Sequence, residues 1–423
     1  NKYMYGFYLF YIILLLATLL SDHVLLSLES SLFYFRFFFL IFLFIFCFNQ
    51  SKKFANYFFY ILFITFVILY IDSFVQLFTG RNLMGFPKFE NDWRISSFFG
   101  DDMKLGGYIA RIFPILICFS LIIKKINKAI FFLVISLLAL IVVIYTGERA
   151  GLIILASNIL FIFIFTSKIF NLRLKLILLV IFSIIAILLY FFSYKNIVNT
   201  KAFERIFEKS FNQYEELVFW QDKENSPNYF TSSHHLAIYS TAFKIFRDNY
   251  ILGSGPKTYR KLCSEKIYSS YYITNGQKEK IINYNKDKPL KWIDHYPEVL
   301  KIRGPNDQLL GSSLYDVFAD SCQTHPHNTY IQLASESGLF GLTLFLFFII
   351  IILFLFIKTI FMSLFKNISN SDFMIIILGS ILINFNPLLP SGSIFNNWLS
   401  IVYYLPIAIL FNINKLKYLD EKN

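Results

Sequence analysis

Apolar and polar stretches alternate along most of this chain, and the apolar stretches are about as long as a membrane helix. About 20 apolar residues are enough for a helix to cross the roughly 30 Å hydrocarbon core of a bilayer. Such stretches occur at Tyr5–Leu20, Leu32–Phe48, Tyr57–Phe78, Gly107–Ile123, Ala129–Tyr145, Gly151–Phe165, Leu174–Phe192, Gly338–Ile357, Phe373–Leu389 and Trp398–Phe411. The pattern predicts an all-α, polytopic integral membrane protein with about ten transmembrane helices.

One polar segment is much longer than the other connections. It divides the chain into transmembrane helices 1–7 (residues 1–192), a large loop (residues 193–328), and transmembrane helices 8–10 with a tail (residues 329–423). The spacing of apolar residues in Lys201–Phe219 and Ser240–Arg247 predicts short amphipathic helices against the membrane face. Weak periodicity predicts irregular structure over Ser264–Leu314.

Composition and charge agree with this topology. The chain is 56% hydrophobic, contains 53 Phe and has a net charge of +12. Basic residues gather in every second short connection, for example at Lys52, Lys53, Lys124 and Lys125. By the positive-inside rule these connections and both termini are cytoplasmic, so the large loop lies on the outer side. The positive charge therefore reflects topology, and we expect no nucleic-acid partner.

The junction between the large loop and the eighth apolar stretch has the sequence HPHNTYIQLASESGLFGL. Asn328 or Thr329 can cap a helix, and Gln332 stands where a capping box after Thr329 requires it. The apolar run then follows without a break. His327 would thus precede a helix N-terminus, which favours a neutral, proton-accepting imidazole and attracts anions. The alternative is a structural histidine at a helix cap.

Basic residues and glycines on the outer side are further candidates. Arg149, in GERAGL, would present its guanidinium at headgroup depth to a lipid-linked phosphate. Alternatively, it reaches toward the interface or pairs with Glu148. Gly253 and Gly255 predict a tight turn whose N–H groups approach a ligand, and Arg260 follows that turn.

Glu336 lies near the outer end of the eighth apolar stretch, where an unpaired carboxylate is costly. It is the second catalytic candidate beside His327, and it could orient a histidine or bind an arginine. On a continuous helix it would lie about half a turn from His327 in azimuth, which argues against direct contact unless the backbone bends at the start of the helix.

Cysteines and histidines give two further expectations. Cys263 and Cys322 could form a disulfide if the large loop faces an oxidising compartment, although sequence does not give their separation. The two imidazoles of HPH have no third metal ligand at a recognisable spacing, with His234 and His235 as the only nearby candidates. The chain also lacks a phosphate-binding Walker loop, a dinucleotide fingerprint and a hydrolase elbow. We therefore expect no metal, no cofactor and no nucleotide donor.

Three motifs together resemble the bacterial O-antigen ligase and polymerase family, over roughly Phe98–Leu410. HPHNTYIQLASESGLFG resembles the family signature, in which His-Asn at a helix start precedes E-x-G-x-x-G; here these glycines include Gly338. GERAGL resembles the family's arginine motif, and RDNYILGSGPKTYR resembles its third conserved element.

The resemblance implies glycan transfer from undecaprenyl diphosphate at the periplasmic face of the bacterial inner membrane, without metal or nucleotide. His327 would be the base that activates the acceptor, and Arg149 would bind the diphosphate. His235 stands where the family has a second arginine, and Arg260 and Arg247 are the alternative cations. The implied partners are the lipid-linked glycan, an acceptor glycan or lipid A core, and membrane lipids.

Rival functions remain at this point. The same site could serve an O-antigen polymerase or a protein O-oligosaccharyltransferase with the same donor. A transporter or flippase of lipid-linked sugars is the rival of another class. It predicts charged residues and broken helices at mid-membrane, whereas this chain keeps its polar groups near the outer ends of the apolar stretches.

Overall fold

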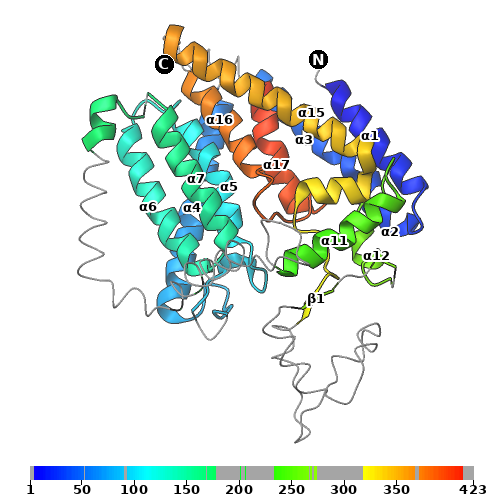
Figure 1. The fold of residues 1–423 in the computed structure, drawn as a ribbon. Helices are drawn as coiled ribbons and strands as arrows, with labels where there is room; N and C mark the ends of the chain where they lie inside the picture. Colours follow the sequence, from blue (N-terminus) through cyan, green and yellow to red (C-terminus); the bar gives the residue numbers. More distant parts are fainter. Residues whose placement is uncertain are drawn as a thin grey trace, which may run out of the picture. The chain divides into compact units, whose positions relative to one another are not determined.

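The computed structural model describes residues 4–51, 53–89, 93–167, 169–177, 201, 205, 233–265, 267–268, 271–273, 318–366 and 371–412 (Figure 1). The chain divides into two compact units. Unit 1 comprises Asn1–Phe33, Gln213–Leu344 and Ser391–Phe395. Unit 2 comprises Tyr34–Asn212, Phe345–Pro390 and Asn396–Asn423. Each unit is therefore assembled from segments that are far apart in the sequence.

Helices occupy the predicted apolar stretches wherever the structure describes them. Unit 2 contains α3 (Arg36–Gln50), α4 (Phe54–Thr79), the short η2 (Ser97–Phe99), α5 (Leu105–Ser120), α6 (Lys128–Thr146), α7 (Arg149–Phe165), α16 (Ser371–Asn384) and α17 (Asn397–Phe411). Unit 1 contains α1 (Met4–Leu19) and α2 (Val24–Ser31), and η1 (Leu32–Phe35) follows α2. Helix α15 (Thr329–Lys366) begins in unit 1 and continues into unit 2. Most of the predicted stretch Leu174–Phe192 lies outside the described residues.

Within the described residues, four helical stretches are long and apolar enough to cross a membrane. These are Val24–Gln50, Phe54–Thr79, Lys128–Thr146 and Thr329–Ser363. Shorter apolar helices occur at Tyr5–Leu19, Leu105–Ser120, Arg149–Phe165, Asp372–Asn384 and Asn397–Phe411. The chain is thus mostly helical with the character of a membrane protein, and the total of ten spans stays a prediction.

Helix α5 lies at the centre of unit 2. It contacts α4, α6, α7, α16 and α17. Every residue of α5 except Tyr108 is buried, from Leu105 to Ser120. A helix that is apolar on all sides is stable only when other helices surround it, so the sequence of α5 requires this central position.

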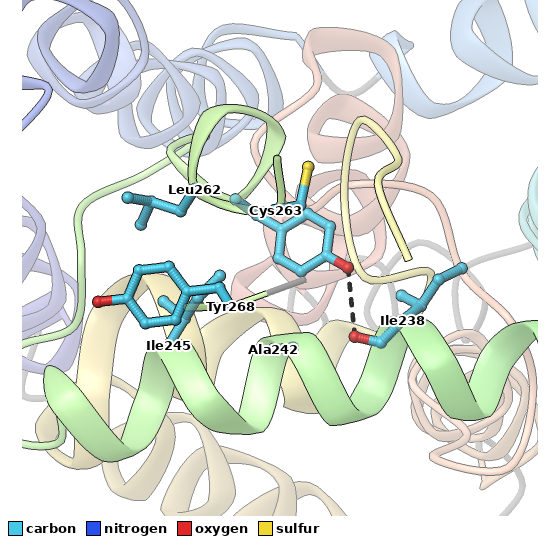
Figure 2. Packing of buried hydrophobic residues seen from close by; sticks show 7 residues of the cluster. Ile238, Ala242, Ile245, Leu262, Cys263 and Tyr268 are labelled. Atoms are coloured by element: carbon cyan, nitrogen blue, oxygen red, sulfur yellow. Dashed lines mark hydrogen bonds between the residues drawn. The ribbon is translucent and has the colours of Figure 1, made fainter. Parts of the chain in front are cut away.

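Unit 1 has a small core built on α11 (Ser233–Asp248) and α12 (Tyr259–Leu262). Figure 2 shows the buried cluster, in which Ile238, Ala242 and Ile245 of α11 pack with Tyr259, Leu262, Cys263 and Tyr268. The Tyr259 hydroxyl donates to the Ser321 carbonyl at 2.7 Å and also lies 3.2 Å from the Ile238 carbonyl oxygen. The core therefore joins α11 to the chain just before the HPHN motif.

The large loop agrees only in part with its predicted secondary structure. Helix α11 includes the predicted helix Ser240–Arg247. The predicted helix Lys201–Phe219 lies outside the described residues except at positions 201 and 205. Strand β1 (Tyr271–Ile273), inside the stretch expected to be irregular, pairs antiparallel with β2 (Phe318–Asp320). A strand of three residues is too short to leave a periodic signal in the sequence, and its partner strand lies far away along the chain.

Candidate active site

His327 and Asn328 form the start of α15. Of the two predicted caps, Asn328 is the one that caps the helix: its Oδ1 accepts the N–H groups of Tyr330 at 3.0 Å and Ile331 at 3.2 Å. His327 directly precedes this cap and has a φ of 54°, in the left-handed region that residues other than glycine rarely adopt. Backbone conformations of this kind are concentrated at functional sites.

Gln332 does not complete the predicted capping box. With Asn328 as the N-cap, Gln332 stands one position too late for that motif. Its buried amide instead donates through Nε2 to Glu336 Oε2 and Ser393 Oγ, each at 2.8 Å. Its Oε1 accepts the Ile394 N–H at 3.0 Å. Gln332 therefore ties the first turns of α15 to the segment that contains Ser393.

Three histidine rings lie together ahead of α15. The ring of His327 lies 4.2 Å from that of His325 and 6.1 Å from that of His235, measured between centroids. His235 comes from α11, and its ring lies 5.9 Å from that of Tyr239. Tyr239 in turn hydrogen-bonds to the Asn328 side chain. The start of α15 is thus packed against α11.

His325 is held in one tautomer. Its Nε2 lies 3.2 Å from the Ser391 carbonyl oxygen, which can only accept, so Nε2 carries the proton. Nδ1 then accepts from Thr324 Oγ1 at 2.9 Å. Burial lowers the pKa of His325 to about 4; His327 and Arg260 act in the same direction and the bond to Ser391 opposes them. His325 is therefore a neutral neighbour of His327 at pH 7.

Ser391 forms hydrogen bonds with the histidine segment. Its N–H donates to the His327 carbonyl oxygen at 2.8 Å, and its Oγ lies 2.9 Å from Thr329 Oγ1. Together with the bond from His325, these contacts fix both the backbone and one ring of the motif. Nothing in the sequence near Ser391 indicates this role, because it lies more than 60 residues away from the motif.

Two glycines cross at very short range inside unit 1. Gly253 has a φ of 79° and Gly338 a φ of 66°, and a Cβ on either would collide with the backbone of the other's segment. Around the crossing, Ser254 N–H donates to the Ser335 carbonyl at 3.0 Å and Gly255 N–H to the Glu336 carbonyl at 3.0 Å. The positive φ of Gly338 breaks α15. Backbone pairing with the neighbouring turn satisfies the groups that the break releases.

Gly255 serves a different contact. Its φ is 102°, and a Cβ there would collide with the side chains of Ser21 and of Ser27 in α2. The GSGP turn is therefore packed between the start of α2 and α15.

The Glu336 carboxylate is fully buried and is directed at the turn before α12. Its Oε1 accepts the Tyr259 N–H at 3.0 Å, while Oε2 accepts from Gln332. It also accepts from the backbone of Lys257 and interacts electrostatically with Arg260. Glu336 thus holds the segment that carries Arg260.

Arg260 is one of the two arginines predicted as cations in this part of the chain. Its charge acts on both His325 and Glu336. Its Nε is buried and makes no hydrogen bond in the described part of the chain. Arg247, the other alternative, is largely exposed on α11 and lies 3.5 Å from its neighbour Asp248.

Cys263 and Cys322 form a disulfide, with their Cα atoms 4.9 Å apart. The bond follows Arg260 by three residues and precedes His325 by three. It therefore joins the two segments that carry the candidate cation and the candidate base.

The GERAGL turn belongs to unit 2 and brings two helix N-termini together. The Glu148 carboxylate accepts the N–H groups of Gly106 at 2.7 Å and Gly107 at 2.9 Å, in the first turn of α5. Arg149 is the first residue of α7 and is half-buried. Burial raises the pKa of Glu148, whereas the bonds from Gly106 and Gly107 and the nearby arginines lower it.

Three arginines that the sequence did not single out surround this turn. Arg94 Nε donates to the Thr146 carbonyl at 2.7 Å, and Arg205 Nε to the Gly147 carbonyl at 3.3 Å. Arg111 is buried in α5 and acts electrostatically on Glu148. An arginine inside an apolar stretch is the one sequence signal that could have identified Arg111. With Arg149 they make a strongly cationic environment around one carboxylate.

Within the described residues, no group of His, Cys, Asp or Glu side chains has the arrangement of a metal site. The residues that carry the site are instead cations, imidazoles and helix N-termini. Such groups bind anions and accept protons. Apolar helices long enough to cross a membrane, together with groups of this chemistry, define the class as a membrane protein with anion-binding and proton-accepting side chains.

Comparison with protein families agrees with this class. The family model described as O-antigen ligase matches residues 134–289. The matched segment contains Arg149, His235 and Arg260 and ends before His327. The match supports the O-antigen ligase and polymerase family for this chain, and with it glycan transfer of the ligase or polymerase type. No curated protein matches the chain.

Proposed function

We propose that this protein transfers a glycan from undecaprenyl diphosphate to an acceptor hydroxyl at the periplasmic face of the bacterial inner membrane. The observation that carries the proposal is the environment of His327. This histidine precedes a capped helix N-terminus in a left-handed conformation and packs against the neutral ring of His325. The family match supports the type of reaction.

In the proposed reaction His327 acts as the general base. The acceptor hydroxyl attacks the anomeric carbon of the lipid-linked sugar, and His327 takes the hydroxyl proton. The bond between the anomeric carbon and the diphosphate oxygen breaks, and the carrier leaves with that electron pair. A positioned base is worth typically 10² to 10⁴ in rate. The proposal involves no metal or cofactor, as the family resemblance implies.

Fixed positive charge would stabilise the diphosphate as negative charge develops on it. We propose that Arg149 binds the diphosphate at the N-terminus of α7, where partial positive charge of the helix favours anions. The cationic environment formed with Arg94 and Arg111 supports this assignment. Arg260 and His235 would supply the second cationic group, and the unbonded Nε of Arg260 supports its part.

Glu336, which the motif suggests as catalytic, would contribute by positioning. Its carboxylate accepts backbone N–H groups of the turn before Arg260, and no hydrogen bond joins it to His327 within the described residues. Its proposed role is to keep Arg260 in place. The glycines Gly253, Gly255 and Gly338 would serve the same purpose through the backbone.

Replacement of the proposed base and anion-binding arginine tests this function. His327→Ala and Arg149→Ala should each reduce transfer at least a hundredfold with purified protein in detergent or nanodiscs, while expression and membrane insertion stay normal. His23→Ala and Arg173→Ala are the control variants, because both residues lie outside the motifs; Arg173 is exposed and His23 is partly exposed. Near-normal transfer by the His327 variant would remove it from the mechanism.

A second experiment identifies the acceptor. The purified protein is incubated with undecaprenyl diphosphate-linked glycan in two tubes, one of which contains lipid A core, and the products are read by mass spectrometry. Glycan on the core establishes a ligase, and lengthened carrier-linked glycan establishes a polymerase. Glycan on an added acceptor protein would establish a protein O-oligosaccharyltransferase.

The break in α15 is the one observation that favours the transporter alternative, because broken helices are typical of transporters. The break follows the polar first turns of the helix, and its backbone is hydrogen-bonded to the Gly253 turn. This arrangement is also expected if the break forms part of the wall of a site on the outer side. Movement of the carrier lipid across a vesicle membrane without any glycan transfer would favour the transporter.

A further inference from the structure

Helix α11 presents an apolar face that the described residues of its own unit leave exposed. One side of the helix packs into the unit 1 core through Ile238, Ala242 and Ile245. On the other side, Phe243 is 64% exposed. The chain that follows the helix continues this face, with Tyr250 56% and Ile251 46% exposed. Large apolar side chains exposed side by side mark a surface that meets a protein or a lipid.

The neighbouring backbone indicates which of these covers the face. Leu339 N–H donates to the Tyr250 carbonyl at 2.8 Å, and Phe340 N–H donates to the Ile251 carbonyl at 3.3 Å. Leu339 and Phe340 are themselves exposed, and they open the long apolar part of the candidate span Thr329–Ser363. The apolar face of α11 is therefore continuous with residues at the point where a helix enters the membrane.

Charge and residue type on this face also suit a lipid surface. Lys244 is half-buried and Arg247 is exposed on the same helix. Aromatic residues flanked by Lys and Arg are typical of helices that lie in the headgroup layer, with the basic side chains reaching outward. A protein partner would need a matching surface, whereas a helix that enters a bilayer at Leu339 and Phe340 brings lipid headgroups to this face.

We propose that α11 is anchored in the lipid headgroup layer through Phe243, Tyr250 and Ile251. His235 is two turns before Phe243 on this helix, a rise of about 12 Å. Because His235 contacts His327, the anchor fixes the height of the histidine cluster above the bilayer. This last step rests on the proposed function. The height of the histidine cluster matters because the diphosphate of the proposed lipid-linked donor lies at a fixed depth in the bilayer.

Fluorescence quenching tests the anchor without any activity measurement. Tryptophan is introduced as Phe243→Trp, and its emission is taken as the difference from the parent protein in nanodiscs of phosphatidylethanolamine and phosphatidylglycerol. Dibrominated lipids should quench this emission at least twofold, and aqueous iodide should not. Lys261→Trp is the control, because Lys261 is exposed on α12, away from this face. Quenching by iodide alone, or by neither reagent, overturns the proposal.

A transfer assay tests the consequence. Phe243→Ser should raise the KM for the long-chain donor several-fold and leave the KM for a water-soluble short-chain donor unchanged, with kcat little affected. An equal effect on both donors overturns the link between anchor and site. If the parent protein shows no transfer, the proposed function fails while the quenching result still decides the anchor.

Discussion

Gln332 and Glu336 lie one turn apart in α15 and share a hydrogen bond of 2.8 Å, in which Nε2 of the amide donates to the carboxylate. Both side chains are buried. Gln332 also binds Ser393 and Ile394, while Glu336 binds the backbone of Tyr259. This pair therefore connects three segments, of which one carries His327 and another carries Arg260.

Gln332→Glu should disrupt this connection. The variant places a second carboxyl beside Glu336 and, when ionised, removes the donor to both Glu336 and Ser393. An unsatisfied buried group costs about 1 to 3 kcal/mol, and a like charge adds to that cost. We expect transfer to fall more than tenfold at pH 8 and to recover in part near pH 6, where a protonated carboxyl can donate again. Gln50→Glu, on an exposed residue, should have no effect. A Gln332→Glu profile that parallels the parent at every pH would contradict this account.

Substitution of Gly253 or Gly338 by alanine should destabilise the protein more than substitution of Gly80 or Gly6. Gly253→Ala and Gly338→Ala combine a positive φ with a backbone collision. Gly80 has a φ of 85° but open space around it, and Gly6 has open space and no positive φ. We therefore expect losses of melting temperature in the order Gly253 and Gly338, then Gly80, then Gly6. Left-handed backbone alone costs about 1 kcal/mol for alanine, so Gly80→Ala isolates that part.

The glycine series is measured by thermal unfolding in one detergent, with all four variants purified in parallel. Equal losses for Gly80 and Gly253 would mean that the backbone crossing does not constrain the fold. A larger loss at Gly6 than at Gly338 would contradict the break in α15.

Removal of the Cys263–Cys322 disulfide should lower both stability and activity. The bond joins two cysteines that are 59 residues apart in the sequence, and so closes a loop of that length. Loop-closure entropy gives such a bond about 4 kcal/mol of stabilisation. Cys263→Ser with Cys322→Ser, or treatment with a reductant, should therefore lower the melting temperature and the transfer rate together. Cys47→Ser is the control, since Cys47 is a free cysteine. An unchanged melting temperature and transfer rate in the double variant and in the reduced parent would contradict the role of the bond.

The sequence alone predicts the helices and the motifs but, apart from the possible Cys263–Cys322 disulfide, not the contacts between distant segments. Apolar runs such as Tyr57–Phe78 need only length and composition to predict a helix, and α4 lies there. The cap at Asn328 follows from its position before the helix. The spacing after Thr329, however, predicts a capping box for Gln332, whereas its partners Ser393 and Ile394 are about 60 residues away. Local spacing carries no information about such pairs.

The same limit explains the missed arginines and the missed helix break. Arg94 and Arg205 reach the GERAGL turn from distant parts of unit 2. Gly338 looked like an ordinary glycine in an apolar helix, and its positive φ becomes necessary only because the Gly253 turn crosses there. Sequence patterns specify what each segment forms, whereas the site depends on which segments meet.

His325 should make the stability of the protein depend on pH. Burial lowers its pKa to about 4 from an ordinary value of 6.5, so folding favours the neutral ring. This contribution is complete above pH 6.5 and is lost as the pH falls toward 4. At about 1.4 kcal/mol per pKa unit, the loss between pH 7.5 and pH 5 is about 2 kcal/mol. His325→Gln keeps a donor for Ser391 and an acceptor for Thr324 but does not titrate.

The free energy of unfolding of the parent and of His325→Gln should therefore converge as the pH is lowered. It is measured by SDS titration in detergent micelles at pH 7.5 and pH 5. His23→Gln is the matched control, because it makes the same exchange of side chains outside the histidine segment. A constant difference between the parent and His325→Gln would mean that His325 titrates in the folded protein as it does in the unfolded chain. The lowered pKa of His325 would then be excluded.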